Sequence, residues 1–166
     1  MEGKSRPPID PYGLALKWLA VRELSERQTR QRLQSRRVSP AAVDDVVARL
    51  RRNGALDDRR TALAAARTGV LIKHHGRHRV IRQLEAIGID RDLARRTVEE
   101  VFEGVDERAL MERALAGRPG RRGRTIRDPA EYRRLFSLLI RRGFDASAVN
   151  TLLRSRARGA ARSDDE

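Results

Sequence analysis

Hydrophobic residues recur along this chain at intervals of three and four, and short polar segments separate one hydrophobic run from the next. Residues at this spacing lie on one face of an α-helix, so each run predicts an amphipathic helix. A clear example is the series Val43, Val46, Val47 and Leu50. No stretch alternates hydrophobic and polar residues as a half-buried strand would. We therefore expect an all-α fold.

Residues that favour helix starts divide this pattern into nine expected helices. The expected N-caps include Asp10, Ser25, Ser39, Asp57, Asp90, Asp128 and Asp145. Ser25 and Gln28 fit a capping box for the second helix, which otherwise carries little hydrophobic surface beyond Leu33. The fourth helix is expected to run through about Leu71.

One seven-residue pattern occurs three times, at 84–90, at 139–145 and, in a weaker form, at 33–39. In the first copy Leu84 is followed by Gly88, Ile89 and Asp90. A glycine in the left-handed conformation ends a helix in a Schellman turn, and the next apolar residue then packs back on the same helix. An acidic residue or Ser after the turn suits the N-cap of a following helix. Each copy therefore predicts helix, tight turn, helix.

The three copies indicate three tandem three-helix repeats. We place the first repeat at 10–56, the second at 57–104 and the third at 105–157, with a flexible basic loop at 117–127. A disordered tail at 1–9 and a polar tail at 158–166 are expected at the ends. Because one unit of about 45 residues is small for independent stability, the repeats should pack on their neighbours. The expected result is an elongated array that can curve.

Composition adds charge to this picture. The 166 residues include 37 Lys and Arg against 23 Asp and Glu, a formal net charge of +14. Such a surface attracts polyanions, and nucleic acid is the first candidate. The alternative is a solubilising surface that follows from an Arg-rich composition, since only three of the basic residues are Lys.

Several classes of protein find no support in the sequence. The absence of cysteine excludes disulfides and thiolate metal sites. There is no run of about 18 apolar residues for a membrane span. No apolar segment near the start is typical of a secretory signal. We therefore expect a cytoplasmic protein without membrane contact.

The histidines are the first candidates for a metal site. His74, His75 and His78 lie close in sequence, but Gly76 breaks the helical spacing that paired histidine ligands need. We interpret these side chains as solvated loop histidines and expect no metal.

Two other motifs are open to a catalytic interpretation. The segment 117–125 is similar to a phosphate-binding loop only in its glycines and basic residues, and its spacing does not match. Asp57 and Asp58 suit a helix N-terminus better than acid–base chemistry. We expect neither a cofactor nor enzyme activity.

Five short motifs together resemble the RecX family of recombination regulators. They are Arg22-Glu23-Leu24-Ser25, Gly54-Ala55-Leu56-Asp57-Asp58 with Ala62, Gly76 with Ile81-Arg82-Gln83-Leu84, Gly88-Ile89, and Arg141-Arg142-Gly143-Phe144. The resemblance covers roughly residues 11–155, and the order of the motifs makes it specific. The residues that carry it are expected to be structural: Leu56, Asp57, Asp58, Gly76, Ile81, Leu84, Gly88, Ile89, Leu139, Gly143 and Phe144.

The resemblance implies three tandem three-helix repeats and a role in homologous recombination, DNA repair and the SOS response. Proteins of this family bind the recombinase RecA, lie in the groove of its filament on DNA, and inhibit its ATPase and strand exchange. The implied partners are therefore the RecA filament and single- or double-stranded DNA, and we expect a monomer. A general DNA-binding or architectural protein with helix-turn-helix-like repeats remains the alternative. Thr29, Arg37 and Ala55 depart from the family pattern, and Arg37 replaces the turn glycine of the first repeat.

Basic residues near the expected turns are the candidate contacts with the filament or with DNA. They are Lys73, Arg77, Arg79 and Arg82 in the second repeat, Arg121, Arg122 and Arg124 in the loop, and Arg141 and Arg142 in the third repeat. We expect reversal of Arg77, Arg79 and Arg82 to Glu to weaken inhibition of RecA without unfolding the protein.

Overall fold

The computed structural model describes residues 10–116, 126 and 128–163, and side chains through residue 157. Within these ranges the chain forms α-helices and one π-helical turn, and no strand. The elements are α1 (Pro11–Val21), α2 (Glu26–Ser35), α3 (Pro40–Arg52), α4 (Asp58–Arg67), η1 (Thr68–Ile72), α5 (Arg77–Ala86), α6 (Arg91–Phe102), α7 (Glu107–Ala116), α8 (Pro129–Arg141) and α9 (Ala146–Ser163). The predicted all-α fold is confirmed.

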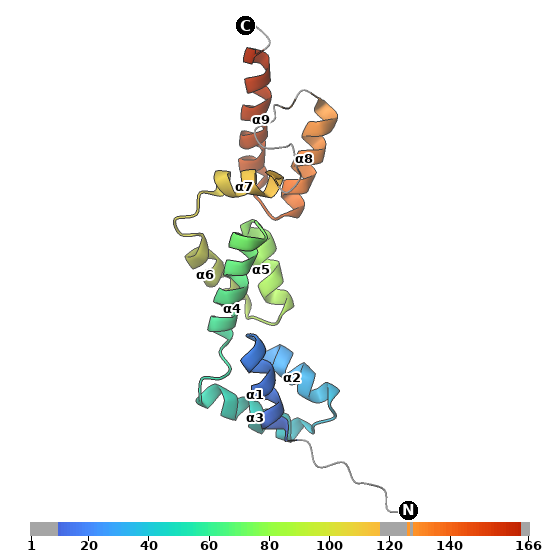
Figure 1. Ribbon diagram of the computed structural model, residues 1–166, viewed down its shortest axis with the longest axis vertical. Coiled ribbons are helices and arrows are strands. Elements are labelled where there is room, and N and C mark those ends of the chain that lie inside the picture. The colour runs from blue at the N-terminus through green and yellow to red at the C-terminus, as the bar shows by residue number, and fades with distance from the viewer. Residues whose placement is uncertain (1–9, 117–125, 127, 164–166) are drawn as a thin grey trace, which may run out of the picture.

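The molecule is an elongated stack of three groups of helices (Figure 1). Helices α1–α3 form one end, α4–α6 the middle, and α7–α9 the other end. None of the described helices is both long and apolar enough to cross a membrane. The expected tail at 1–9 and most of the expected loop at 117–127 lie outside the described residues.

Side-chain caps place the helix starts where the sequence predicted them. The capping box of α2 is complete: the Gln28 amide N–H donates to Ser25 Oγ over 3.1 Å, and the Ser25 N–H donates to Gln28 Oε1 over 3.1 Å. Asp10, Asp90 and Asp128 likewise accept backbone N–H groups at the starts of α1, α6 and α8. Local chemistry therefore sets these boundaries.

The end of the fourth helix differs from the prediction. Helix α4 stops at Arg67, and Thr68–Ile72 form a π-helical turn instead of a continued α-helix. Within this turn Gly69 lies so close to α5 that an added Cβ would be 3.2 Å from Val80 Cγ2. The wider turn seats Gly69 against α5, and it leaves Leu71 and Ile72 58% and 73% exposed.

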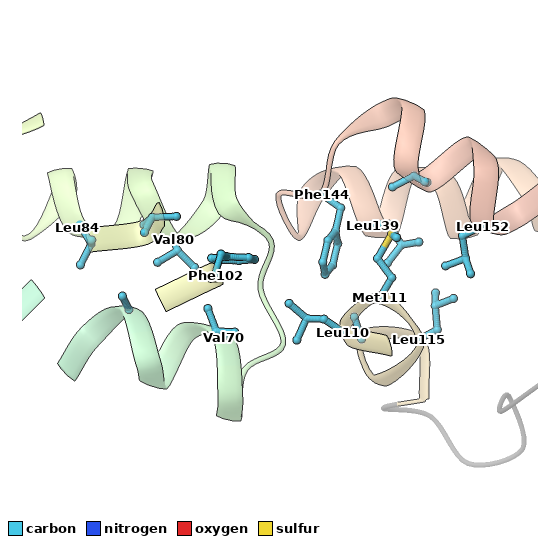
Figure 2. Close-up of a cluster of buried hydrophobic side chains, with 14 of the residues drawn as sticks. Val70, Val80, Leu84, Phe102, Leu110, Met111, Leu115, Leu139, Phe144 and Leu152 are labelled. Atoms are coloured by element: carbon cyan, nitrogen blue, oxygen red, sulfur yellow. The ribbon is translucent and has the colours of Figure 1, made fainter. Parts of the chain in front are cut away.

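The hydrophobic side chains form two separate clusters. The first belongs to α1–α3 and the segment before α4: Ala15, Leu33, Val43, Val46, Val47, Leu50 and Leu56. The second runs without a break through α4–α9. Figure 2 shows its two halves, with Val70 and Phe102 on one side and Leu110 and Phe144 on the other. Ile126, in the segment expected to be a flexible loop, is also buried in this second cluster.

The three recurring turns are Schellman turns, as predicted. The N–H of Ile89 donates to the Leu84 carbonyl over 3.0 Å, and Phe144 donates to Leu139 over 3.2 Å. In the weaker copy Val38 donates to Leu33 over 3.3 Å. The residue before each donor has positive φ: 97° at Gly88, 87° at Gly143 and 60° at Arg37.

The last helix is longer than predicted. Helix α9 runs to Ser163, although a polar tail was expected from residue 158. Arg and Ala favour helical backbone without needing a core to pack against, so polar composition alone does not end a helix.

Candidate functional site

The start of one middle helix contacts the turn of the next repeat, and this arrangement occurs twice. At the joint between the second and third repeats, the Gly76 N–H donates to the Arg142 carbonyl over 2.8 Å. The His78 N–H donates to the Gly143 carbonyl over 3.1 Å. The carbonyl groups that end α8 therefore satisfy the free amides that begin α5, and the dipoles of the two helices meet head to tail.

The joint between the first and second repeats has the same plan but different donors. Here the Ser25 hydroxyl donates to the Ile87 carbonyl. Arg27 Nη2 donates to the Glu85 carbonyl over 3.1 Å and to the Ala86 carbonyl over 2.5 Å. The start of α2 thus contacts the end of α5 as the start of α5 contacts the end of α8. The middle helices α2, α5 and α8 follow one side of the stack (Figure 1).

These contacts give the turn glycines a second role. A Cβ on Gly88 would lie 2.5 Å from Arg27 Cβ, and a Cβ on Gly143 would lie 2.5 Å from Arg79 Cβ and closer still to the Arg79 backbone nitrogen. A Cβ on Gly76 would lie equally close to the Gly143 carbonyl oxygen. Gly88 and Gly143 therefore allow both a left-handed turn and close approach of the neighbouring repeat, whereas Gly76, with a φ of −79°, allows the close approach alone.

The first turn shows why Arg37 is tolerated. Arg37 is exposed, whereas Gly88 is half-buried and Gly143 is buried. Within the described residues no other repeat lies against this turn, so a side chain there costs only the strain of the left-handed backbone. That strain is roughly 1–2 kcal/mol for a residue with a Cβ.

Three of the nine candidate basic residues are fully or partly engaged within the chain. Arg77 Nε pairs with Glu107 Oε1 at 2.5 Å, and its guanidinium lies 4.5 Å from the centroid of the Phe102 ring. Arg79 Nη1 donates to the Arg141 carbonyl over 2.9 Å. Arg142 Nη1 donates to the Lys73 carbonyl over 2.9 Å. These bonds tie the second repeat to the third.

This geometry corrects one expectation. Reversal of Arg77, Arg79 and Arg82 to Glu removes the Arg77–Glu107 pair and the bond from Arg79 to the Arg141 carbonyl. The triple variant is therefore expected to loosen the joint, so it does not isolate binding from folding.

The described candidates other than Arg77 retain some exposed surface. Lys73, Arg82 and Arg141 are exposed, and Arg79 and Arg142 are half-buried. The backbone contacts above bring four of them together. We call Lys73, Arg79, Arg141 and Arg142 the joint cation cluster. In the part of the chain that the structure describes, none of these four makes an ion pair with a carboxylate. Arg121, Arg122 and Arg124 lie outside the described residues.

His75 lies beneath the joint cation cluster and is buried, which contradicts its interpretation as a solvated loop histidine. Its Nδ1 lies 3.3 Å from Gln83 Oε1. Burial lowers the pKa of His75, and the positive charges of Arg79, Arg142 and Lys73 lower this pKa further, against the opposing effect of the Gln83 hydrogen bond. His75 is therefore neutral at pH 7.

The other two histidines have different surroundings. His74 is half-buried with a φ of 52°, and His78 is exposed. Among the described residues, no three His, Asp or Glu side chains gather as a metal site would require.

The two adjacent acids serve the start of α4. Asp57 Oδ1 accepts the N–H groups of Arg59 and Arg60 at 2.8 and 3.1 Å. Asp58 Oδ1 accepts the N–H of Glu26 at 2.8 Å and so links the second repeat to the first. Burial raises the pKa of Asp58. Both carboxylates are thus hydrogen-bonded in the way that helix caps are.

Two joints of one design make the molecule a tandem helical repeat protein, in which three-helix units stack end to end. The family model for RecX, first three-helix domain, matches residues 12–50. The chain is 30% identical over 165 residues to Regulatory protein RecX of Trichlorobacter lovleyi, with 89% of this chain and 96% of that protein covered. It is 27% identical over 143 residues to Regulatory protein RecX of Chlorobium phaeobacteroides, with 86% and 90% covered. The chain belongs to the RecX family of regulatory proteins.

Solved structures agree on the fold. The crystal structure of RecX from Lactobacillus salivarius superposes with a TM-score of 0.69 at 17% identity, over 88% of this chain and 94% of that one. A second crystal structure of a regulatory protein RecX gives a TM-score of 0.73 at 20% identity, over 86% of this chain and 69% of that one. At this identity the likeness concerns the fold.

Proposed function

We propose that this protein is a non-enzymatic regulator of homologous recombination and DNA repair. In this proposal it binds the RecA filament on DNA as a monomer and inhibits the ATPase and strand exchange of RecA. The family supports a regulatory role, because the curated relatives are regulatory proteins. The elongated stack of repeats suits a partner that is itself extended.

The observation that carries the proposal is the joint cation cluster. Its members come from the η1–α5 segment and from the end of α8 with the turn that follows. Hydrogen bonds across the joint hold them together, both between backbone groups and from the Arg79 and Arg142 guanidinium groups to backbone carbonyls. Like charges held close repel one another, and a bound anion would relieve that repulsion. The nearby Asp145 already serves as the N-cap of α9, where it accepts the N–H of Ser147 over 2.8 Å. Phosphates of DNA in the filament are suitable anions.

The direct test is RecA's DNA-dependent ATP hydrolysis in the presence of the purified full-length protein. We expect hydrolysis and strand exchange to fall as the protein is added up to stoichiometric excess. Unchanged rates of both reactions at that excess would rule out the proposed inhibition.

A charge-reversal variant tests the cluster itself. Lys73→Glu with Arg141→Glu changes two exposed side chains and leaves their carbonyl groups free to accept the bonds that hold the joint. We expect this variant to need about tenfold more protein for the same inhibition, as loss of two charge-assisted contacts implies. Arg95→Glu with Arg133→Glu makes the same charge change at exposed positions on α6 and α8 and is the matched control. Equal inhibition by the two variants would remove the cluster from the contact surface.

The second candidate is a general DNA-binding protein. The sharp turn between α5 and α6 is compatible with a helix-turn-helix. In that case the wild-type protein would bind naked duplex DNA tightly and leave RecA unaffected. Each phosphate contact would add about 0.9 to the slope of log K against log salt concentration. Duplex binding with such a slope, together with unchanged RecA activity, would favour this candidate.

A further inference from the structure

An open groove lies where the first and second repeats meet, and its volume is about 560 Å³. One wall is α4 with η1, the other is the second half of α5, and the end of α1 with the start of α2 closes one end. Its lining includes Thr61, Ala64, Ala65, Thr68, Gly69 and Lys73 along the first wall. Thr61 and Lys73 are 12 positions apart, or roughly 18 Å at the helical rise of 1.5 Å per residue. That length matches about three turns of a helix.

The floor of the groove combines small apolar residues with polar side chains that already have hydrogen-bond partners. Ala64, Ala65 and Gly69 leave only small groups on the α4 side. The uncharged polar side chains of the described lining already have partners within the chain. Thr61 Oγ1 donates to the Leu24 carbonyl over 3.1 Å, and Thr68 Oγ1 donates to the Ala64 carbonyl over 2.9 Å. Gln28 Oε1 accepts the Ser25 N–H over 3.1 Å, and Gln83 Oε1 lies 3.3 Å from His75 Nδ1. Bound water or a polar ligand therefore gains little there, whereas an apolar side chain gains from leaving water.

Large exposed aliphatic residues adjoin the groove in sequence at both ends. Val21 precedes the lining residue Arg22 and is 84% exposed. Ile72 precedes the lining residue Lys73 and is 73% exposed. Leu71, at 58%, is the next most exposed large hydrophobic residue of the described part. Large aliphatic residues exposed next to groove-lining positions are typical of a protein-binding surface.

The charge of the groove indicates what its occupant carries. Glu23 is the one carboxylate in the described lining, and it pairs with Arg60 Nε at 2.7 Å. Arg22 and Lys73 remain as uncompensated positive charges, one from each repeat. An occupant with carboxylates near both ends of its apolar face would complement them.

We propose that this groove binds a short amphipathic helix of a protein partner, with an aliphatic face flanked by acidic residues. The inference rests on the proposed function, since it takes that partner to be the protein component of the RecA filament. A nucleic acid is a poorer occupant than such a helix, because its phosphates could contact Arg22 and Lys73 but would bury none of the apolar surface of the groove. In this proposal the groove contacts protein and the joint cation cluster contacts phosphate, and Lys73 lies at the boundary as a member of both surfaces.

A groove-filling substitution tests this inference. Ala64 is exposed on α4 and lines the groove, so Ala64→Trp fills the groove without entering the core. Ala41→Trp places the same side chain at an exposed position of α3 outside the groove lining and is the matched control. Co-sedimentation measures binding of the full-length protein to RecA filaments on single-stranded DNA. Fluorescence anisotropy measures binding to the same DNA without RecA, and circular dichroism checks folding.

We expect Ala64→Trp to weaken filament binding at least about tenfold, as for a blocked interface centre, and to leave naked-DNA binding within about twofold. Ala41→Trp should match the wild type in both assays. Filament binding by Ala64→Trp equal to that of Ala41→Trp would overturn the inference. Equal losses in filament and naked-DNA binding would also overturn it, because the groove would then take DNA. If wild-type protein fails to bind filaments, the proposed function itself falls.

A second variant covers the case in which Ala64→Trp disturbs the fold. Leu71→Ser with Ile72→Ser removes the exposed aliphatic surface and leaves the groove empty. We expect a loss of about three- to tenfold in filament binding, with naked-DNA binding unchanged. Wild-type filament affinity in this folded variant overturns the inference.

Discussion

At both joints of this molecule the start of one middle helix contacts the end of the next, but the two joints differ in their hydrogen-bond donors and in their hydrophobic packing. At the joint between the second and third repeats, backbone amides donate to the turn and one hydrophobic cluster continues across. At the joint between the first and second repeats, the Ser25 and Arg27 side chains donate instead, and the hydrophobic cluster is interrupted. A repeat joined by side-chain hydrogen bonds is held less firmly than one joined through a common core, since apolar burial contributes most of the stability. We therefore expect the first repeat to open before the other two.

The same comparison separates the two proposed contact surfaces. The firmer joint presents the joint cation cluster, and the looser joint contains the apolar groove. Rigid backbone contacts preorganise charges for phosphate, and a groove between units that move slightly can adjust to a protein segment.

The largest expected effect on stability comes from the apolar residue after each turn. Phe144 is 4% exposed in the shared cluster, so Phe144→Ala should cost about 3–5 kcal/mol of the free energy of unfolding. The equivalent Val38→Ala in the first repeat changes a half-buried side chain and should cost less than about 1.5 kcal/mol. Urea denaturation measures both. Equal losses would show that the two turns are held alike.

The turn glycines give the next effect. Gly143→Ala places a Cβ against the backbone of Arg79 and should cost about 3 kcal/mol or more, since backbone there cannot move aside freely. Gly104→Ala is the control, because Gly104 also has a positive φ, of 74°, and no atom within 4 Å of the added Cβ. That change should cost only about 1 kcal/mol of backbone strain. Thermal unfolding of the two variants separates close approach from strain, and matching melting temperatures would refute the close-approach role.

A smaller effect, of opposite sign, is expected at the first turn. Arg37→Gly relieves a left-handed residue with φ of 60° and should raise stability by up to about 1 kcal/mol. Because Arg37 is exposed, no packing is lost. If denaturant melts show destabilisation instead, then the Arg37 side chain makes a contact that outweighs the strain.

The smallest effect is a pH dependence at the firmer joint. The folded-state pKa of His75 is lowered, so the unfolded chain binds the proton more readily. The stability that neutral His75 contributes is therefore complete above the unfolded pKa of about 6.5 and is lost as pH falls below it. The slope is at most about 1.4 kcal/mol per pH unit for one proton. Unfolding free energies measured between pH 7.5 and 5 follow this loss.

The difference between the wild type and one variant isolates that proton. His75→Gln should flatten the stability profile between pH 6.5 and 5. Two N-cap carboxylates titrate below this pH range. Hydrogen bonds from backbone N–H groups lower the pKa of Asp90, and hydrogen bonds from the Ser147 side chain and from backbone N–H groups lower the pKa of Asp145. If the unfolding free energy of His75→Gln keeps the wild-type dependence on pH, then a group other than His75 takes up the proton.

The helices and turns were predictable because their signals are local. Ser25 with Gln28 and Gly88 with Ile89 each act within one turn of chain. The joints were not predictable, because they pair residues such as Arg27 and Glu85 that lie 58 positions apart. The glycines predicted a left-handed turn. A single sequence does not show that the neighbouring repeat also packs against the space that a side chain would fill.

The candidate site residues remain a prediction, and the sequence alone did not give their contacts. Several basic residues chosen for their position near turns lie at the joint between the second and third repeats, but charge does not show whether a guanidinium is already paired, as that of Arg77 is with Glu107. The sequence did not predict the groove, because the small residues of its floor are equally typical of an ordinary Ala-rich helix. The signal that marks the groove is the exposure of Leu71 and Ile72. The sequence does not show this exposure, because the π-helical turn that causes it has no simple sequence pattern.

Hydrogen exchange of the full-length protein, with and without RecA filaments on single-stranded DNA, tests the account most directly. The account predicts added protection at both surfaces: in residues 73–82 and 139–143 at the joint cation cluster, and in residues 61–72 along the groove. It predicts that naked DNA protects only the first set. Unchanged exchange in both sets when filaments are present would contradict the account.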